Sequence, residues 1–229
     1  MYGNQEITKE GEYVKKLIII GAGGFGREVL EYALDMKEAN PQIDWEVKGF
    51  IDDNLACLQQ YNQEFEVIEN IKDHIISNEN VYICAIGDPN IKSAICKDFM
   101  DRGALFINII HPLARVGRRC KLGVGNVICP NACLTTDVCL EDFIFVNCHS
   151  NCGHDSKISS YCTISPFCDI TGFAELGKGV FLGSHASICP SVKIGDFSKI
   201  GAGAAVISDM PSDCTAVGVP AKIVKRKNR

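Results

Sequence analysis

The stretch ISPFCDITGFAELGKGVFLGSHASICPSVKIGDFSKI, residues 164–200, repeats one arrangement every six residues. A large aliphatic residue opens each repeat, at Ile164, Ile170, Leu176, Leu182, Ile188, Ile194 and Ile200. The same step of six continues without a slip over residues 116–206, where Cys152 is the one non-aliphatic member of the series. A small or β-branched residue stands four positions after most of these residues.

This period is too long for either common secondary structure, since an amphipathic helix repeats about every 3.6 residues and a strand about every 2. It suits a chain that runs straight briefly, turns and repeats, so that three sides close a triangular coil. Stacked coils of this kind lie about 4.8 Å apart. The pattern predicts a left-handed parallel β-helix of about five coils, with the aliphatic residues inside. A β-sandwich with coincidental spacing is the alternative interpretation.

The first half of the chain has a different pattern, which predicts a small α/β unit. Residues 17–29, LIIIGAGGFGREV, indicate a buried strand, a GxGxxG turn and a helix that starts near Phe25. Residues 47–51 and 81–86 predict two further strands, and residues 90–102 predict a second helix. Glycines in such a turn let the backbone approach a ligand, and the helix N-terminus offers free N–H groups to an anion.

The predicted fold class is therefore α/β plus all-β. A polar N-terminal segment is expected over residues 1–14, a Rossmann-like parallel-sheet domain over 15–110, and the β-helix with a basic C-terminal tail over 111–229. The front unit is too short for a complete dinucleotide fold, which favours a nucleotide sugar or mononucleotide over NAD. Glycines that serve strand-to-helix packing alone are the remaining interpretation.

Composition narrows the class of protein. The net charge of −5 over 229 residues argues against nucleic acid as a partner. No apolar run approaches the roughly 18 residues of a membrane span, and no signal sequence is evident. The thirteen cysteines are odd in number and include no CxxC pair, which favours reduced thiols and a cytoplasmic location.

Six short strings resemble a known family in their order along the chain. They are GAGGFGREV at 21–29, FIDD at 50–53, AIGD at 85–88, IIHPLARVG at 109–117, VNCHSNCGHD at 146–155 and VGVPAKIV at 217–224. Over residues 17–226 the chain resembles the bacterial sugar acetyltransferases of the NeuD and PglD family, sialic-acid O-acetyltransferases and UDP-4-amino-sugar N-acetyltransferases. The resemblance implies an acetyl-CoA donor and a homotrimer with active sites between packed β-helices.

The resemblance also implies site residues. The general base is the histidine of the GHD string, His154, with Asp155 beside it. The acceptor, expected to be a UDP-amino sugar, is held by Gly23, Gly24, Phe25, Asp52, Asp53 and Gly87. Two positions depart from the family pattern: Phe25 stands where a histidine is common, and Thr163 stands where many members have a second histidine near the acetyl group.

The repeat register places His154 independently of the resemblance. It is the third residue of its repeat, so it belongs to a turn and points outward. One coil later the stacked position is Gly172, which has no side chain. An imidazole over bare backbone suits acyl transfer, which needs a base for the attacking group and an N–H donor for the oxyanion. A solvated surface histidine is the alternative.

Further residues are predicted from the tail and from the resemblance. Basic residues concentrate at the C-terminus, where they suit the phosphates of coenzyme A. The predicted acetyl-CoA contacts are Thr163, Gly172, Ser184, Ala202, Lys225 and Arg226. Several phenylalanines at outward positions suggest packed faces: Phe143, Phe145, Phe167, Phe173 and Phe181.

Two other kinds of chemistry are weaker hypotheses. The cysteines and histidines of residues 148–154 invite a zinc site, but the register turns Cys152 inward and His154 outward, so no metal is expected. Cys148 occupies a turn and could act as a nucleophile, although nothing near it in sequence would lower its pKa.

The leading hypothesis is an acetyltransferase that moves an acetyl group from acetyl-CoA to an amino, or else a hydroxyl, group of a nucleotide-linked sugar. Direct attack with a histidine base is expected. One alternative keeps the enzyme and changes the acceptor to free sialic acid or another small molecule. Another is a β-helix that binds or assembles without catalysis.

Overall fold

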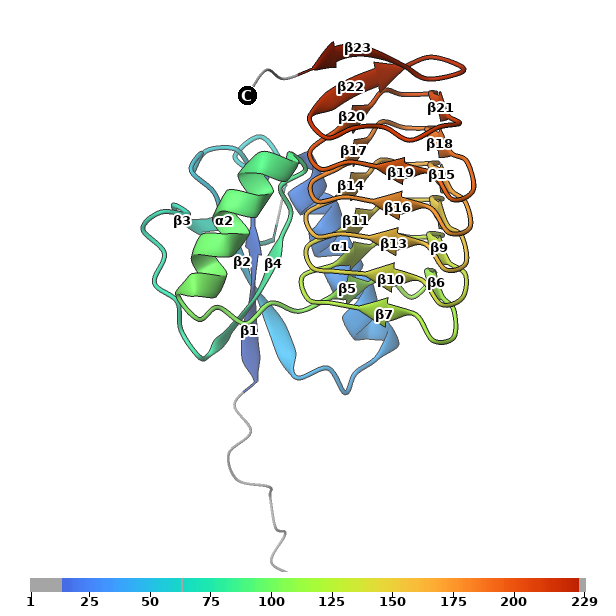
Figure 1. Ribbon diagram of the computed structural model, residues 1–229. Coiled ribbons are helices and arrows are strands. Elements are labelled where there is room, and N and C mark those ends of the chain that lie inside the picture. The colour runs from blue at the N-terminus through green and yellow to red at the C-terminus, as the bar shows by residue number, and fades with distance from the viewer. Residues whose placement is uncertain (1–13, 63, 227–229) are drawn as a thin grey trace, which may run out of the picture.

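The computed structural model of the chain describes residues 14–62 and 64–226 (Figure 1). A small α/β domain, the front domain, lies against one side of a long β-helix. Of the polar segment predicted over residues 1–14, all but the last residue falls outside the described residues. No helix within the described ranges is long and apolar enough to cross a membrane.

The front domain is built on a parallel four-stranded sheet. Its strands, in the order β3-β2-β1-β4, are β3 (Val67–Glu69), β2 (Trp45–Ile51), β1 (Lys15–Ile20) and β4 (Asn80–Cys84). The aliphatic residues 17–20 are fully buried because β1 is covered on both faces. The edge strand β3 was not predicted, since three residues are too few to show a period.

One helix covers each face of this sheet. Helix α1 (Gly24–Ala39) packs between the sheet and the β-helix, so Leu17 and Leu30 share a core with Phe145. Helix α2 (Pro89–Asp101) covers the other face, where Phe99 packs against Tyr82. The Asp88 side chain caps α2 by accepting hydrogen bonds from the N–H groups of Asn90 and Ile91.

The rest of the chain winds into a β-helix of three sheets. The eight-stranded sheet consists of β5 (Ile109–Ile110), β8 (Val127–Ile128), β11 (Phe145–Val146), β14 (Thr163–Ile164), β17 (Phe181–Leu182), β20 (Lys199–Ile200), β22 (Cys214–Val217) and β23 (Lys222–Arg226). The six-stranded sheet consists of β6 (Arg115–Val116), β9 (Cys133–Leu134), β12 (Asn151–Cys152), β15 (Asp169–Ile170), β18 (Ser187–Ile188) and β21 (Ala205–Val206). The five-stranded sheet consists of β7 (Lys121–Leu122), β10 (Cys139–Leu140), β13 (Lys157–Ile158), β16 (Glu175–Leu176) and β19 (Lys193–Ile194).

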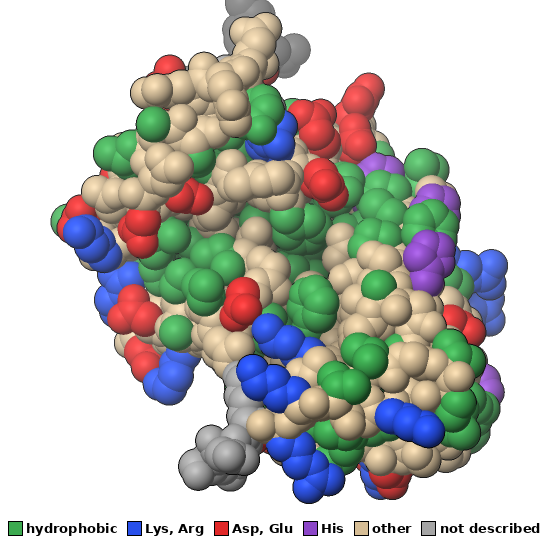
Figure 2. All heavy atoms as spheres, turned by 90° about the horizontal axis from the view of Figure 1, so that it is seen from above, with side chains coloured by type: hydrophobic (Ala, Val, Ile, Leu, Met, Phe, Trp, Pro, Cys, Tyr) green, Lys and Arg blue, Asp and Glu red, His purple; other side chains and the backbone are tan. Residues whose placement is uncertain are grey.

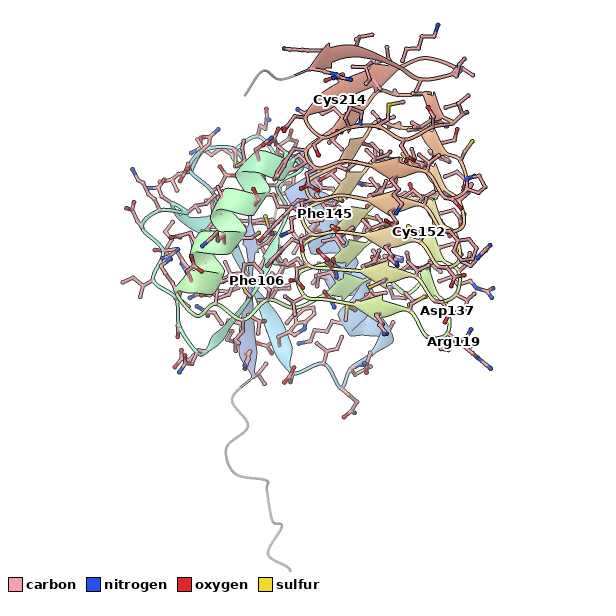
Figure 3. The ribbon with its side chains drawn as sticks, viewed as in Figure 1. Phe106, Arg119, Asp137, Phe145, Cys152 and Cys214 are labelled. Atoms are coloured by element: carbon pink, nitrogen blue, oxygen red, sulfur yellow. The ribbon has the colours of Figure 1, made fainter. Side chains whose placement is uncertain are left out.

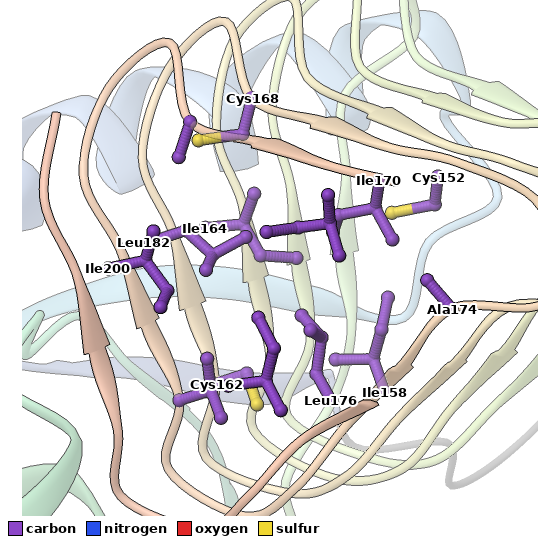
Figure 4. Close-up of a cluster of buried hydrophobic side chains, with 14 of the residues drawn as sticks. Cys152, Ile158, Cys162, Ile164, Cys168, Ile170, Ala174, Leu176, Leu182 and Ile200 are labelled. Atoms are coloured by element: carbon purple, nitrogen blue, oxygen red, sulfur yellow. The ribbon is translucent and has the colours of Figure 1, made fainter. Parts of the chain in front are cut away.

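The register of the coils is the predicted one. Each two-residue strand from β6 to β21 ends on a member of the six-step series, and strands of successive coils pair in parallel, as Val146 does with Ile164. From Ile128 onward the series fills the interior (Figure 4), where Cys152 is as buried as the aliphatic residues around it, whereas Val116 in the first coil is 38% exposed. All thirteen cysteines are free. The fold class predicted from the sequence is confirmed.

The eight-stranded sheet faces the front domain, and aromatic side chains fill the junction (Figure 3). The Phe143 ring meets Phe106 edge-on at 4.8 Å, and the Phe145 ring lies 5.0 Å from Phe25. Phe143 and Phe145 are therefore buried within one chain, so these two do not form the exposed faces suggested by the sequence. Phe167 and Phe173, which lie at other edges, are half exposed.

His111 adds a polar link at this junction. Its Nδ1 accepts from the N–H of Leu113 at 3.0 Å, so Nε2 holds the proton and donates to Asp35 on α1 at 2.9 Å. The ring also meets Tyr32 of α1 edge-on at 5.6 Å.

Candidate active site

His154 lies in the turn between β12 and β13, with 55% of its side chain exposed. Its Nδ1 lies 2.9 Å from Oδ2 of Asp155. A carboxylate only accepts, so Nδ1 donates in this pair and the neutral ring leaves Nε2 free to take a proton. The Phe173 ring stands at right angles to the imidazole, 5.1 Å away. The carboxylate of Asp155 thus fixes the tautomer of the neutral imidazole.

Gly172 lies directly against this imidazole. A Cβ atom at Gly172 would come within 2.6 Å of Nε2 of His154, so no other residue fits beneath the ring in its present position. The N–H of Gly172 has no acceptor within the part of the chain that the structure describes. The imidazole and a backbone N–H without an acceptor among the described residues therefore lie side by side, in the stacking that the register predicted.

A groove of about 480 Å³ opens beside this turn, along the five-stranded sheet. Asp155 and Phe173 border it at one edge, and Lys157 and Glu175 form part of its floor. Arg119 and Asp137, which are labelled in Figure 3, form an ion pair at its far end. A second groove of about 590 Å³ follows the same sheet toward the C-terminal coils.

The glycines of the front domain divide into two kinds. Gly21 has a φ of +99°, and a Cβ at Gly26 would lie 2.1 Å from the carbonyl oxygen of Gly21, so both serve the tight strand-to-helix turn. Gly23 and Gly24 are exposed, and a Cβ on Gly23 would meet nothing within 4 Å. The two predicted acceptor glycines therefore border open space, where a ligand could approach the backbone.

The paired aspartates at the end of β2 are partly engaged with the backbone. Asp52 accepts from the N–H groups of Ala22 and Asn54, both at 2.8 Å, so it fixes the glycine turn beside its own strand. Asp53 is exposed and accepts from the N–H of Ile71 at 3.2 Å. Both carboxylates lie at the carboxyl edge of the sheet, together with the end of β4, where ligands of such sheets bind.

The predicted acceptor and catalytic residues do not meet in one chain. The acceptor edge belongs to the front domain, which packs on the eight-stranded sheet. His154 lies in a turn that joins the other two sheets, at the opposite edge of the β-helix. Cys152, two residues before His154, marks this distant side in Figure 3.

The residues predicted to contact acetyl-CoA occupy several places. Gly172 lies against His154, whereas Ser184 and Ala202 lie in turns that follow β17 and β20. Lys225 and Arg226 lie exposed on β23, at the end of the β-helix where Figure 2 shows several Lys and Arg side chains. They come from different edges, and their convergence on one ligand is not evident within a single chain.

Thr163 is placed differently from the other predicted acetyl-CoA contacts. It lies on β14 under the front domain and is 5% exposed. Its hydroxyl donates to the carbonyl oxygen of Gly87 at 2.8 Å and accepts from Nζ of Lys92 at 2.9 Å. The prediction that Thr163 contacts acetyl-CoA gains no support from this arrangement.

Sequence reasoning missed two features, the burial of Lys92 and the lowered pKa of Cys148. Lys92 is fully buried at the domain junction, and burial lowers its pKa to about 8. A single lysine within an amphipathic helix gives no sign of such a location. The hydrogen bond from Cys129, with a further one from Tyr32, lowers the pKa of Cys148 to about 6. The spacing of Cys129 and Cys148, close to one coil, could have suggested their contact.

The side chains that suggested a zinc site do not point toward a common centre. Cys152 points into the core, whereas His154 points outward. Among residues 14–62 and 64–226 there is no group of three or more His, Cys, Asp or Glu side chains that could hold a metal ion.

Comparison with known proteins covers both halves of the chain. The PglD N-terminal domain model matches residues 16–99, and the bacterial transferase hexapeptide model, of six repeats, matches residues 173–208. The GDP-perosamine N-acetyltransferase of Escherichia coli O157:H7 is 28% identical over 216 residues, which cover 91% of this chain and 96% of that protein.

Two solved structures superpose on this chain over nearly its whole length. The acetyltransferase domain of PglB from Neisseria gonorrhoeae FA1090 superposes with a TM-score of 0.83 at 27% identity, covering 92% of this chain and all of that one. PerB from Caulobacter crescentus, solved in complex with CoA and GDP-perosamine, has a TM-score of 0.81 at 27% identity and covers 93% and 98% of the two chains. The chain is thus similar over nearly its whole length to hexapeptide-repeat sugar N-acetyltransferases, with a PglD-type N-terminal domain followed by hexapeptide repeats.

Proposed function

We propose that this protein transfers an acetyl group from acetyl-CoA to the amino group of a nucleotide-linked sugar, with His154 as general base. The observation that supports this most is the His154 pair: Nδ1 is held by Asp155, and Nε2 lies free over the bare backbone of Gly172. The amine is preferred over a hydroxyl because the full-length relatives named above include N-acetyltransferases of GDP-perosamine.

The proposed reaction is a direct transfer. The amine nitrogen attacks the thioester carbonyl carbon of acetyl-CoA while Nε2 of His154 removes one proton from that nitrogen. The negative oxygen of the tetrahedral intermediate accepts a hydrogen bond from the N–H of Gly172. When the carbon–sulfur bond breaks, the imidazolium returns its proton to the thiolate, so the products are the amide and free coenzyme A.

The acceptor site is proposed at the carboxyl edge of the front sheet. Gly23 and Gly24 leave room for the backbone to approach the diphosphate, and Phe25, Asp53 and Gly87 border the same edge. Asp52 supports the edge by holding the N–H of Ala22. The sequence suggested a UDP sugar, whereas the relatives act on GDP-perosamine, so both nucleotides belong in the test.

The active site is proposed to lie between chains of a homotrimer. In a single chain the acceptor edge and His154 lie on opposite sides of the β-helix, so an acceptor held by one chain has to reach His154 of a neighbour. Acetyl-CoA is proposed to run past Gly172, Ser184 and Ala202 toward Lys225 and Arg226, whose charges suit its phosphates. The free thiols favour a cytoplasmic location.

The test is an assay of thiol release from acetyl-CoA with a panel of acceptors. The panel contains UDP- and GDP-linked 4-amino sugars, the matched 4-hydroxy sugars, free sialic acid and an amino acid. Thiol release with a nucleotide amino sugar, and an amide in the product by mass spectrometry, supports the proposal. Release with sialic acid alone would assign an O-acetyltransferase, and no release together with no binding of coenzyme A would leave a non-catalytic β-helix.

A further inference from the structure

Lys92 is a buried charged side chain to which the reaction described above gives no role. It comes from α2 and is 0% exposed. Its Nζ donates to the carbonyl oxygen of Cys162 at 3.0 Å and to the hydroxyl of Thr163 at 2.9 Å. The same atom lies 3.5 Å above the centre of the Phe145 ring. Thr163 and Phe145 belong to the eight-stranded sheet and Cys162 directly precedes its strand β14, so Lys92 ties the front domain to the β-helix.

The first route from Lys92 leads to the loop after β4. Thr163, which accepts from Lys92, donates to the carbonyl oxygen of Gly87 at 2.8 Å. Gly87 precedes Asp88, the N-terminal cap of α2. The proposed acceptor residue Gly87 is thereby fastened to β14 through one hydroxyl, and Lys92 fixes the orientation of that hydroxyl because an ammonium group can only donate.

The second route leads to the glycine turn. The cation of Lys92 lies on one ring, Phe145, and the centre of that ring is 5.0 Å from the ring of Phe25. Phe25 follows Gly24 at the start of α1, in the other loop of the proposed acceptor site. A single buried side chain therefore contacts the supports of both loops at the carboxyl edge of the front sheet.

A buried ammonium joins two domains at a cost in folding free energy, because burial removes the charged group from water. Burial lowers the pKa of Lys92 to about 8, while the nearby Cys84, Cys162, Cys96 and Asp88 act in the opposite direction. An apolar side chain of similar length would fill the space without this penalty. A role in orienting polar groups explains the lysine better than a role in stability.

We propose that Lys92 is a positioning residue that holds both acceptor loops in their binding geometry, acting on Gly87 through Thr163 and on Phe25 through Phe145. The proposal rests on the proposed function for the identity of the ligand, a nucleotide-linked sugar. A second part of the proposal, the mechanical claim, is independent of that function: the two loops lose order when the Lys92 contacts are lost.

The mechanical claim is tested by hydrogen–deuterium exchange of the full chain. Three variants are compared with the wild type: Lys92→Met, which removes the donor; Lys92→Arg, which keeps a cation; and Thr163→Val, which cuts the route to Gly87. Lys97→Met, an exposed lysine of the same helix, is the matched control. We expect at least about tenfold faster exchange at residues 21–26 and 87–90 in Lys92→Met. Thr163→Val should affect only residues 87–90, and Lys97→Met neither segment.

The kinetic claim is tested with the best acceptor of the panel. In Lys92→Met and Thr163→Val the KM for the nucleotide sugar should rise about tenfold, with kcat and the KM for acetyl-CoA changed less than about threefold. Lys92→Arg should recover part of the loss.

Unchanged exchange in both segments, or a fall in kcat with both KM values unchanged, would overturn the positioning role. Should the wild type acetylate no nucleotide sugar, the proposed function fails alone, because the exchange result still decides whether Lys92 orders the loops.

Discussion

At the scale of single residues, the candidate site depends on one missing side chain. The imidazole of His154 lies where a Cβ of residue 172 would be, so the ring position requires glycine there. The register of the sequence predicted this stacking, since both residues are third in their repeats. The contact with Phe173 could not be predicted, because it depends on the rotamers of both rings.

Gly172→Ala should therefore displace the imidazole and leave the coil intact. We expect kcat/KM to fall about 10- to 100-fold, as small misplacements of a catalytic group produce losses of this size. The measurement is the thiol-release assay, with circular dichroism to confirm the fold. Thr136→Ala, at the same turn position two coils before Gly172, serves as the control and should keep its activity. Full activity of Gly172→Ala would show that the ring is not held over residue 172 during catalysis.

Cys148 offers a second residue-scale prediction, based on pH. Hydrogen bonds from Cys129 and Tyr32 stabilise the thiolate and lower the pKa of Cys148 from 9.0 to about 6. Since the thiolate is the reactive form, alkylation by iodoacetamide should speed up as pH rises to about 6 and level off above about 7. Mass spectrometry of Cys148 peptides gives the rate at each pH. The buried Cys152, whose pKa burial raises, is the internal control and should not react in the folded protein.

A Cys148 rate that keeps rising beyond pH 8 would contradict the lowered pKa. Tyr32→Phe removes one donor and should shift the midpoint upward. The lowered pKa does not make Cys148 the catalytic nucleophile, because it lies beside α1 while His154 lies at the opposite edge. Cys148→Ala should retain turnover.

At the scale of elements, the turns at the corners of the β-helix share a backbone conformation that the six-residue period does not reveal. The fourth residue of most repeats has a positive φ, at Arg119, Asn131, Asp137, Phe143, His149, Asp155, Tyr161, Phe167, Phe173, His185, Ser191 and Phe197. Glycine serves the same conformation at Gly125, Gly179 and Gly203. Glycine, asparagine, aspartate and histidine are expected there, whereas phenylalanine is not.

Stacking explains the aromatic residues at these corners. The rings of His149, Phe167 and His185 lie in one column, with centres 4.9 and 5.0 Å apart and planes nearly parallel. Figure 2 shows histidine and hydrophobic side chains together along one edge. His149 and His185 lie two coils apart, and the Phe167 ring between them completes the column.

Lys92 gives the element-scale prediction, since it lies where α2 meets β14. Its pKa is about 8 in the folded protein against 10.5 when free, so the unfolded chain binds more protons between these values. Stability therefore rises with pH over that interval, by up to about 3 kcal/mol from this group. Urea unfolding at pH 7.5 and pH 10 should show this rise in the wild type and lose it in Lys92→Met.

Lys92→Arg is the control for that measurement. An arginine stays charged throughout this range, so its variant should also lack the rise. An equal rise in the wild type and Lys92→Met would assign the pH dependence to other groups.

At the scale of the whole molecule, the sequence predicted the architecture better than the assembly of the site. The two halves, the coil register and the carboxyl edge of the front sheet all follow from local patterns. The junction between the halves does not, because Phe145, Lys92 and Thr163 meet from segments far apart in the chain. For the same reason, the position of Thr163 under the front domain could not be predicted from the sequence.

A site shared between chains leads to a whole-molecule prediction. His154→Ala removes the base, and Gly24→Tyr should block the acceptor edge, where a side chain has open space. Each variant alone should be inactive. When both are co-expressed in equal amounts, sites that combine the intact edge of one chain with the intact base of another should restore about a quarter of wild-type activity. No recovery in mixed oligomers, verified by differently tagged chains, would place the whole site within one chain.

The most direct test of the account is the turnover of His154→Ala with acetyl-CoA and the best nucleotide amino sugar. We expect kcat to fall at least about a hundredfold, because the proton acceptor for the attacking amine is gone. Melting temperature and the affinity for coenzyme A should stay close to those of the wild type. A correctly folded His154→Ala protein that turns over within a few-fold of the wild type would contradict the central claim.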